Sequence, residues 1–274
     1  VEINEECDGQ AYCKEDCTWE AQSLINNATP PSLEWVYVEG GTFSLPFGGE
    51  TYQVTVPDFE ITKTEITARQ YKACVDAGVC NPNAGLNYTS ERWEHPVTPL
   101  WVHCREFAHW LGGELPTWAQ WAYAATDGGQ WYEIDPSIER CAAGDIRLAN
   151  VPWQSYVMHS CNGEGTSPVC SYPASRNLLG LCDLYGNLSE YLLDSTEATG
   201  PFPLDGSAYT NRDSCGPGSP KYSAGLSHRS GGYTGNRAQI TTNDHCYYDK
   251  TYVGFRIVRP AKPWRRRRLP VLRQ

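Results

Sequence analysis

The spacing of apolar and polar side chains predicts short strands at the start of the main part of the chain. Tyr52, Val54 and Val56 alternate with polar residues, as in a strand with one buried face. Gly40–Gly41 indicates a turn between two apolar, β-rich stretches. Strands are therefore predicted at residues 35–38, 42–45, 52–56 and 59–62.

Apolar residues at intervals of three and four predict three helices, at 64–77, 102–111 and 117–125. Thr67 and Thr117 are residue types that cap helix N-termini, and Pro116 precedes the second of them. Gly112–Gly113 marks the end of the middle helix. Two strands are predicted to close the fold, around residues 229–233 and 252–258.

The stretch from Gly180 to Asp194 places Asp183, Asn187, Glu190 and Asp194 within a strongly apolar run. Burying carboxylates is costly unless they are paired. Two interpretations follow: a structural turn held by hydrogen bonds, or a site for a hard cation such as calcium, which takes carboxylate and carbonyl oxygens.

Composition favours a chain that spends much of its length in turns and irregular loops, with short strands more likely than long helices. The 274 residues contain 25 Gly, 19 Pro, ten Trp and seventeen Tyr, which predicts many turns and short strands. Residues 1–32 are predicted to form a Cys-containing extension and linker, 33–260 the main domain, and 261–274 a basic tail.

The chain contains twelve cysteines but no Cys-x-x-Cys pair, which favours disulfides over zinc. Neighbouring candidates for pairing are Cys74 with Cys80, and Cys170 with Cys182. The high, even number of cysteines predicts an extracellular, cell-surface or periplasmic protein. No signal peptide is visible at Val1, so we expect the mature form, with its leader removed.

The net charge of the chain limits the kinds of partner that it can bind. The formal net charge is −10, and the tail alone carries six positive charges, so an acidic body argues against nucleic acid as the main partner. No apolar run reaches the ~20 residues that a membrane helix needs, so no transmembrane segment is predicted. The run Arg265–Arg268 is interpreted as part of a solvated tail, with an electrostatic contact or a processing site as the alternatives.

Six stretches in sequence order resemble the formylglycine-generating enzyme (sulfatase-modifying factor) family, a variant of the C-type lectin fold. They are residues 35–43, 61–71, 112–125, 180–194, 230–233 and 253–256. The resemblance implies an irregular, disulfide-rich α+β fold with little regular secondary structure, commonly stabilised by calcium.

The resemblance also implies where catalysis should be located. The family's enzymes bind copper through two cysteines that are five residues apart, and soft thiolates suit Cu(I). The corresponding positions are Gly235 and Ile240, and residues 235–253 contain only Cys246. We therefore expect no copper and no formylglycine-generating activity.

Calcium is the cofactor that the resemblance implies. A first structural site is expected from Asp183 and Glu190 with the backbone carbonyls of Gly186 and Leu188. A second site would use Asn150, the carbonyl of Val151 and groups in the 162–165 turn, although Cys161 lies near the place of an expected Asp.

The last predicted strand pair carries side chains typical of recognition loops. The predicted ligand-binding residues are Tyr233, Asn236, Arg237, Asn243, Asp244, Tyr247 and Tyr248. A polar loop with structural tyrosines is the plainer interpretation.

Three functions follow from these features. The first is an exported, calcium-stabilised, non-catalytic module that binds a protein or glycan. The second is a periplasmic oxidase of the same family with another cofactor. The third is a self-assembling subunit of an extracellular structure.

Overall fold

The structure is a computed structural model, which describes part of the chain. The described residues are 30–47, 50–82, 90–130, 159–160, 163–164, 166–171, 176–184, 187–194, 201–209, 222–225, 239–241 and 253–261. The predicted closing strand at 252–258 is described from residue 253 on, and the predicted strand at 229–233 lies outside these ranges.

Two small sheets form the frame. The first is antiparallel and joins β1 (Trp35–Val38), β4 (Phe59–Thr62) and β11 (Val258–Pro260) in the order β1-β4-β11. The second sheet joins β10 (Val253–Gly254), β7 (Ser189–Leu192), β8 (Tyr222–Gly225) and β9 (Gln239–Thr241) in the order β10-β7-β8-β9. In this sheet β10 pairs in parallel with β7, and the other pairs are antiparallel.

Two further strand pairs lie outside these sheets. β2 (Gly41–Phe47) and β3 (Glu50–Val56) form a hairpin in which Val54 and Val56 are buried, as the alternation predicts. β5 (His159–Ser160) and β6 (Gly163–Glu164) make a short antiparallel pair.

Three α-helices agree closely with the predicted ones. They are α2 (Ala68–Asp76), α3 (Trp101–Trp110) and α4 (Trp118–Ala125), with a short 3₁₀ turn, η1 (Ser90–Arg92), before α3. Thr67 and Thr117 each close a capping box, with Gln70 and Gln120 respectively. The predicted first helix starts at residue 64, but the structure begins it after Thr67 because the capping threonine adopts an extended backbone.

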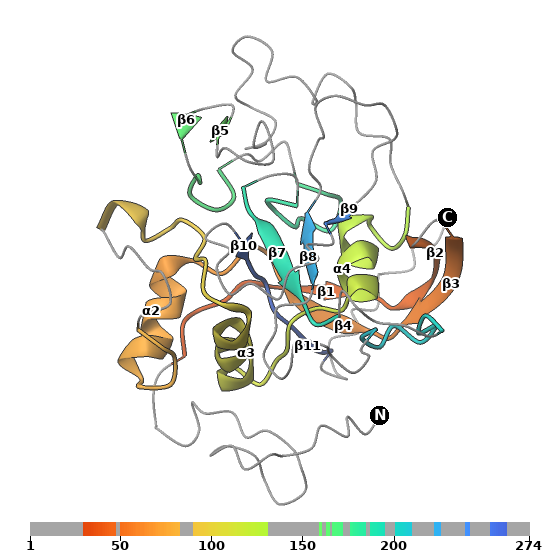
Figure 1. The fold of residues 1–274 in the computed structure, drawn as a ribbon, viewed down its shortest axis with the longest axis horizontal. Helices are drawn as coiled ribbons and strands as arrows, with labels where there is room; N and C mark the ends of the chain where they lie inside the picture. The colour runs from red at the N-terminus through yellow and green to blue at the C-terminus, as the bar shows by residue number, and fades with distance from the viewer. Residues whose placement is uncertain are drawn as a thin grey trace, which may run out of the picture.

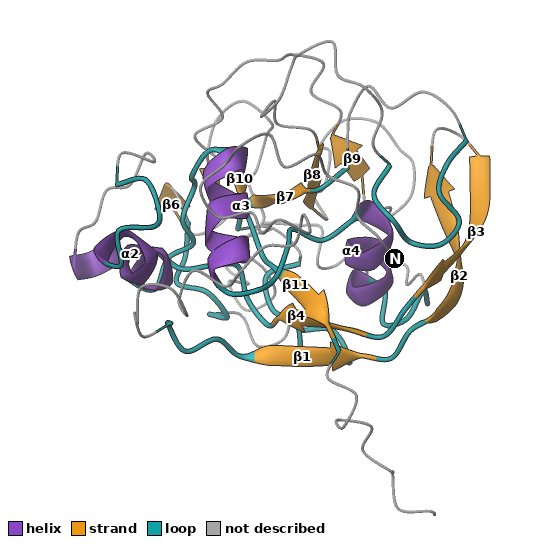
Figure 2. Cartoon of the chain, turned by 90° about the horizontal axis from the view of Figure 1, so that it is seen from below, coloured by secondary structure: helices purple, strands orange, loops and turns teal. Residues whose placement is uncertain are grey.

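The helices lie at opposite ends of the second sheet. In Figures 1 and 2, α2 and α3 lie together at one end, and α4 lies between β8 and the β2–β3 hairpin at the other. Buried side chains form two cores that match this division, one around α4 and one around α2 and α3. Tyr191 belongs to one core and Leu192 to the other, so neighbouring side chains of β7 face different cores.

The last segment differs from its prediction. One strand is predicted over 252–258, whereas the structure divides it into β10 and β11, which belong to different sheets. The carbonyl groups of Phe255 and Ile257 accept hydrogen bonds from Ile66 and Thr62. The chain crosses from one sheet to the other here, and it brings Arg256 into the interior, where the side chain is fully buried.

The helices of the described residues are all too short or too polar to cross a membrane.

Candidate functional site

Four polar side chains of the 180–194 stretch are buried, namely Asp183, Asn187, Glu190 and Asp194, and β7 positions Glu190. Glu190, on β7, is 1% exposed and pairs with Arg256. Arg256 Nε donates to Glu190 Oε2 and Nη2 donates to Oε1, each at 2.6 Å. Trp121 of α4 donates its indole N–H to Oε2 at 2.7 Å. This carboxylate therefore joins β7, α4 and the crossing segment before β11.

Glu65 is a third charged member that sequence reasoning did not assign to the site. It lies between β4 and α2 and is fully buried. Its Oε1 accepts from the backbone N–H of Leu188 at 3.1 Å, and its Oε2 accepts from the Asn187 side chain at 2.7 Å. The local sequence gives little signal for this role, because Glu65 lies more than 100 residues before its partners Asn187 and Leu188.

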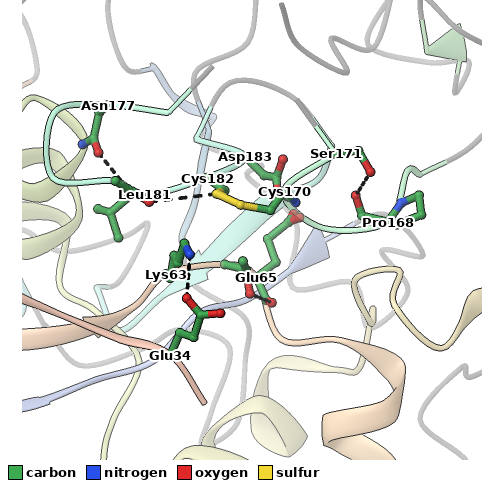
Figure 3. The surroundings of a disulfide bond; sticks show 12 residues. Glu34, Lys63, Glu65, Pro168, Cys170, Ser171, Asn177, Leu181, Cys182 and Asp183 are labelled. Atoms are coloured by element: carbon green, nitrogen blue, oxygen red, sulfur yellow. Dashed lines mark hydrogen bonds and ion pairs between the residues drawn. A yellow bond between two sulfur atoms is a disulfide. The ribbon is translucent and has the colours of Figure 1, made fainter. Parts of the chain in front are cut away.

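Asp183 brings a third carboxylate. It is 4% exposed, and its Oδ2 accepts from the backbone N–H of Cys170 at 2.6 Å. Cys170 and Cys182 form a disulfide directly beside it, and Figure 3 shows this bond next to the side chains of Asp183 and Glu65. We call Glu65, Asp183, Glu190 and Arg256 the acidic cluster.

The electrostatics of the acidic cluster are unbalanced, because three carboxylates face one guanidinium. Burial, together with the charges of Asp183 and Glu190, raises the pKa of Glu65 well above its usual range. Burial also raises the pKa of Asp183. Burial alone would lower the pKa of Arg256, but the surrounding carboxylates raise it. A bound cation would relieve this repulsion.

The donor set suits a hard cation in kind, since it consists of carboxylate and amide oxygens. Within the ranges that the structure describes, no three His, Cys, Asp or Glu side chains gather closely enough to hold a metal by themselves. A cation here would therefore also need backbone carbonyls, such as the predicted ones at residues 186 and 188.

Asp194 forms a separate buried contact at the end of the same stretch. Its Oδ2 accepts from the backbone N–H of Trp118 at the start of α4, at 2.6 Å. Its Oδ1 accepts from the Tyr209 N–H at 2.9 Å. Burial raises the pKa of Asp194 to about 6. Asp194 therefore has a structural role, because its hydrogen bonds join the end of β7 to α4 and to the 201–209 segment.

The predicted site residues are thus only partly brought together. Asp183 and Glu190 are members of the acidic cluster and the Leu188 N–H donates to Glu65, while the side chains of Asp183, Asn187, Glu190 and Asp194 all accept hydrogen bonds. Gly186 and the predicted second site at Asn150 and Val151 lie outside the described residues. Calcium at either place stays a prediction.

The predicted ligand-binding residues also lie outside the described part of the chain, namely Tyr233, Asn236, Arg237, Asn243, Asp244, Tyr247 and Tyr248. They fall in the connections that join β8 to β9 and β9 to β10. Both disulfide predictions are confirmed, since Cys74 pairs with Cys80 and Cys170 with Cys182. Cys104 is a buried free thiol.

The chain is similar in sequence to one protein family and to several of its members. The family model for the sulfatase-modifying factor enzyme 1-like domain matches residues 21–261. The formylglycine-generating enzyme of Mycobacterium tuberculosis is 35% identical over 107 residues, which cover 37% of this chain and 34% of that protein. The serine/threonine-protein kinase Pkn1 of Chlamydia trachomatis is 26% identical over 192 residues, 60% of this chain and 28% of that protein.

A further relative, the inactive C-alpha-formylglycine-generating enzyme 2 of Bos taurus, is 30% identical over 122 residues, 43% of this chain and 38% of that protein. The chain thus spans about a third of the length of these curated relatives.

Two solved structures share the fold at low sequence identity. CarF matches with a TM-score of 0.54 at 21% identity, covering 85% of this chain and 100% of that chain. Variable protein 1 of Treponema denticola matches with a TM-score of 0.54 at 15% identity, covering 84% and 96%. The predicted irregular α+β fold class is confirmed.

Proposed function

The chain belongs to the sulfatase-modifying factor enzyme 1-like domain family, and we propose that it is an exported, non-catalytic binding module of that family, stabilised by calcium. The observation that carries the proposal is the missing pair of copper ligands. Residues 235–253 contain Cys246 and no second cysteine, so two thiolates five residues apart cannot form there. Without them the chain lacks the soft site that would hold Cu(I).

The experiment is a copper titration followed by turnover of a sulfatase-motif peptide. We expect neither stoichiometric Cu(I) binding nor an aldehyde product by mass spectrometry. The formylglycine-generating enzyme of Mycobacterium tuberculosis is the positive control. Stoichiometric Cu(I) binding with aldehyde formation would overturn the proposal.

Calcium is assigned to the acidic cluster because that cluster holds three buried carboxylates against a single guanidinium. Hard oxygen donors of this kind are those that calcium prefers. Asp183 supplies a carboxylate and residues 186 and 188 supply carbonyls in this proposal. Glu190 binds Arg256 and Trp121 through its two oxygens, so it contributes charge to the site and positions its neighbours.

Elemental analysis of the protein after gel filtration in calcium-containing buffer tests this assignment. We expect at least one calcium ion per chain in the wild-type protein and a lower content in Asp183→Asn. Equal calcium content in the two proteins would remove Asp183 from the site.

Recognition is assigned to the connections between β8, β9 and β10. These strands belong to one sheet with β7, and β7 carries Glu190 of the acidic cluster. Loops positioned by a rigid frame are where binding residues concentrate. The relative named as an inactive formylglycine-generating enzyme supports a non-catalytic use of the fold.

Export is supported by two disulfides in the described part of the chain. Disulfides persist in oxidising compartments and are rare in the cytosol. A protein or glycan outside the cell is the partner class that this location makes available.

A further inference from the structure

We propose that the outer edge of β3 is an interaction surface for a second copy of this chain. The two copies pair by strand addition, so that their β2–β3 hairpins form one continuous four-stranded sheet. The inference goes beyond the proposed function, and it needs neither calcium nor a recognition ligand.

Backbone hydrogen bonding alternates along β3, and Thr55 shows which residues point outward. Its N–H donates to the Leu204 carbonyl at 2.8 Å, so it points away from β2. In an antiparallel pair every second residue directs its N–H and C=O to the same side. Gln53 and Thr51 therefore also direct these groups away from β2. The contact of 2.7 Å between the hydroxyl groups of Thr42 and Thr55 agrees, because side chains are closest where the backbone bonds are not exchanged.

The 201–209 segment covers only the C-terminal part of this edge. It contacts β3 through the Leu204 carbonyl and through Gly206, where an added Cβ would lie 3.0 Å from the Thr55 carbonyl oxygen. Among the described residues, no further backbone group bonds to the outward N–H and C=O of Thr51 and Gln53. Figures 1 and 2 both show β3 as the outer strand of the hairpin.

The two edges of the hairpin differ in how they are protected. Exposed edge strands are normally blunted by proline, by charged side chains or by a covering segment. β2 has Pro46 opposite Thr51, which is an outward position, and proline has no N–H to offer there. β3 contains no proline, and Glu50 at its start is its only charged residue. The edge of β3 thus keeps a row of donors and acceptors that a further strand can extend.

The side chains next to this row suit a copy of the same acidic chain. Thr51, Gln53 and Thr55 are exposed and uncharged, and so are Thr42 and Ser44 across the hairpin. The formal net charge of the chain is −10, so two copies repel each other where their charged surfaces meet. An uncharged edge is a place where they can approach without this cost.

A two-fold axis beside Tyr52 gives a register that uses the open positions of both copies. Thr51 of each copy pairs with Gln53 of the other, and each pair exchanges two N–H···O=C bonds. Tyr52, which is half-buried in the single chain, then lies opposite Tyr52 of the second copy, and aromatic cross-strand pairs are favourable. The position opposite Thr55 is residue 49, which lies before the start of β3, so the Leu204 contact is kept.

The pairing closes on itself, because each copy contributes the same edge and a two-fold contact stops at the dimer. Two short strand segments cover less than the ~1,600 Å² of a standard protein interface. We therefore expect a weak dimer, whose dissociation constant lies between about 1 µM and 1 mM.

Sedimentation velocity of the full chain over this concentration range tests the inference. We expect the wild-type protein to shift from monomer to dimer as its concentration rises. Gln53→Pro removes an outward N–H, and the two-fold symmetry makes the loss count twice. The dissociation constant of the dimer should therefore rise at least about tenfold.

The matched control is Ser44→Pro, on the other edge of the hairpin. Gln53 Nε2 donates to Ser44 Oγ at 2.6 Å, so both substitutions remove this side-chain bond and each places a proline at an outward position. We expect Ser44→Pro to dimerise like the wild-type protein. Equal weakening in both variants would overturn the assignment to the β3 edge. A wild-type chain that stays monomeric throughout would overturn the dimer, and the edge would then be open only to a strand of a different protein.

A second measurement needs no substitution and covers the case in which the proline variant does not fold. Amide hydrogen exchange of the wild-type protein is followed by NMR at a low and a high protein concentration. The N–H groups of Thr51 and Gln53 should exchange more slowly at the high concentration, because the second copy accepts hydrogen bonds from them. The Thr42 N–H on β2 should exchange at the same rate in both samples. Unchanged rates at Thr51 and Gln53 would overturn the inference.

Discussion

Arg256 and Glu190 form a two-point ion pair in the interior, with both contacts at 2.6 Å and with side chains that are 0% and 1% exposed. The pair joins two parts of the chain that are 66 residues apart. It is embedded among further carboxylates, so the guanidinium compensates more negative charge than that of its direct partner. Its removal should therefore cost more than the loss of an ordinary ion pair.

Replacing Arg256 with Met should destabilise the protein strongly. The change leaves the carboxylates of the acidic cluster buried without their cation, and breaking a buried pair in this way costs about 3–5 kcal/mol. The measurement is the free energy of unfolding from urea titration in the presence of a chelator.

The matched control is Arg69→Met. Arg69 pairs with Glu94 at 2.6 Å, but both side chains are more than half exposed. Pairs of this kind contribute about 0–1 kcal/mol. The loss of unfolding free energy in the double variant Glu190→Gln/Arg256→Met should be smaller than the sum of the losses in the two single variants. Equal losses in Arg256→Met and Arg69→Met would refute the role given to Arg256.

Asp194 should make stability depend on pH below neutrality. Burial raises its pKa from 3.8 to about 6, so the folded protein binds the proton more tightly than the unfolded chain. The resulting stability is fully present below the unfolded pKa and is lost as the pH rises through about 6. The pKa difference corresponds to at most about 3 kcal/mol.

The measurement is the free energy of unfolding of the wild-type protein and of Asp194→Asn between about pH 4 and 7. The difference, wild type minus variant, should grow as the pH falls. Asp205→Asn is the control, because hydrogen bonds from Ser207 lower the pKa of Asp205. A difference that is flat, or that shrinks at low pH, contradicts the assignment.

The two capping threonines should differ in their contribution to stability. Thr117 Oγ1 accepts from the Gln120 N–H at 3.1 Å and also donates to the Gly206 carbonyl at 2.9 Å. Thr67 Oγ1 accepts from the Gln70 N–H at 3.3 Å. Replacing a capping Thr by Ala costs about 1 kcal/mol, and a buried carbonyl left without its donor adds roughly 1–3 kcal/mol.

Thermal unfolding of Thr117→Ala and Thr67→Ala compares these contributions directly. We expect a lower melting temperature in both, with the larger decrease in Thr117→Ala. The reverse order would show that the Gly206 contact contributes little.

Local pattern was sufficient for the strands and α-helices that the structure describes between residues 35 and 125. The alternation at Tyr52, Val54 and Val56, and the capping signals at Thr67 and Thr117, act over a few residues and appear directly in the sequence. The two short-range disulfides could also be predicted, because Cys74 and Cys80 are 6 residues apart and Cys170 and Cys182 are 12 residues apart.

The acidic cluster could be predicted only in part. Asp183 and Glu190 are conspicuous because they interrupt an apolar run, but Glu65 and Arg256 come from distant segments. Their convergence depends on the crossing of the chain between β10 and β11, which local periodicity does not encode. The single strand predicted over 252–258 was wrong for the same reason.

The melting temperature with and without calcium tests most directly the claim that the 180–194 stretch holds the fold together through a bound cation. At a calcium concentration about 100 times the dissociation constant, binding stabilises by about 2.7 kcal/mol, which corresponds to roughly 5–10 °C. We predict that the wild-type protein loses this increment in chelator, and that Asp183→Asn shows a smaller difference between the two conditions. Identical melting temperatures of the wild-type protein in calcium and in chelator would contradict the account.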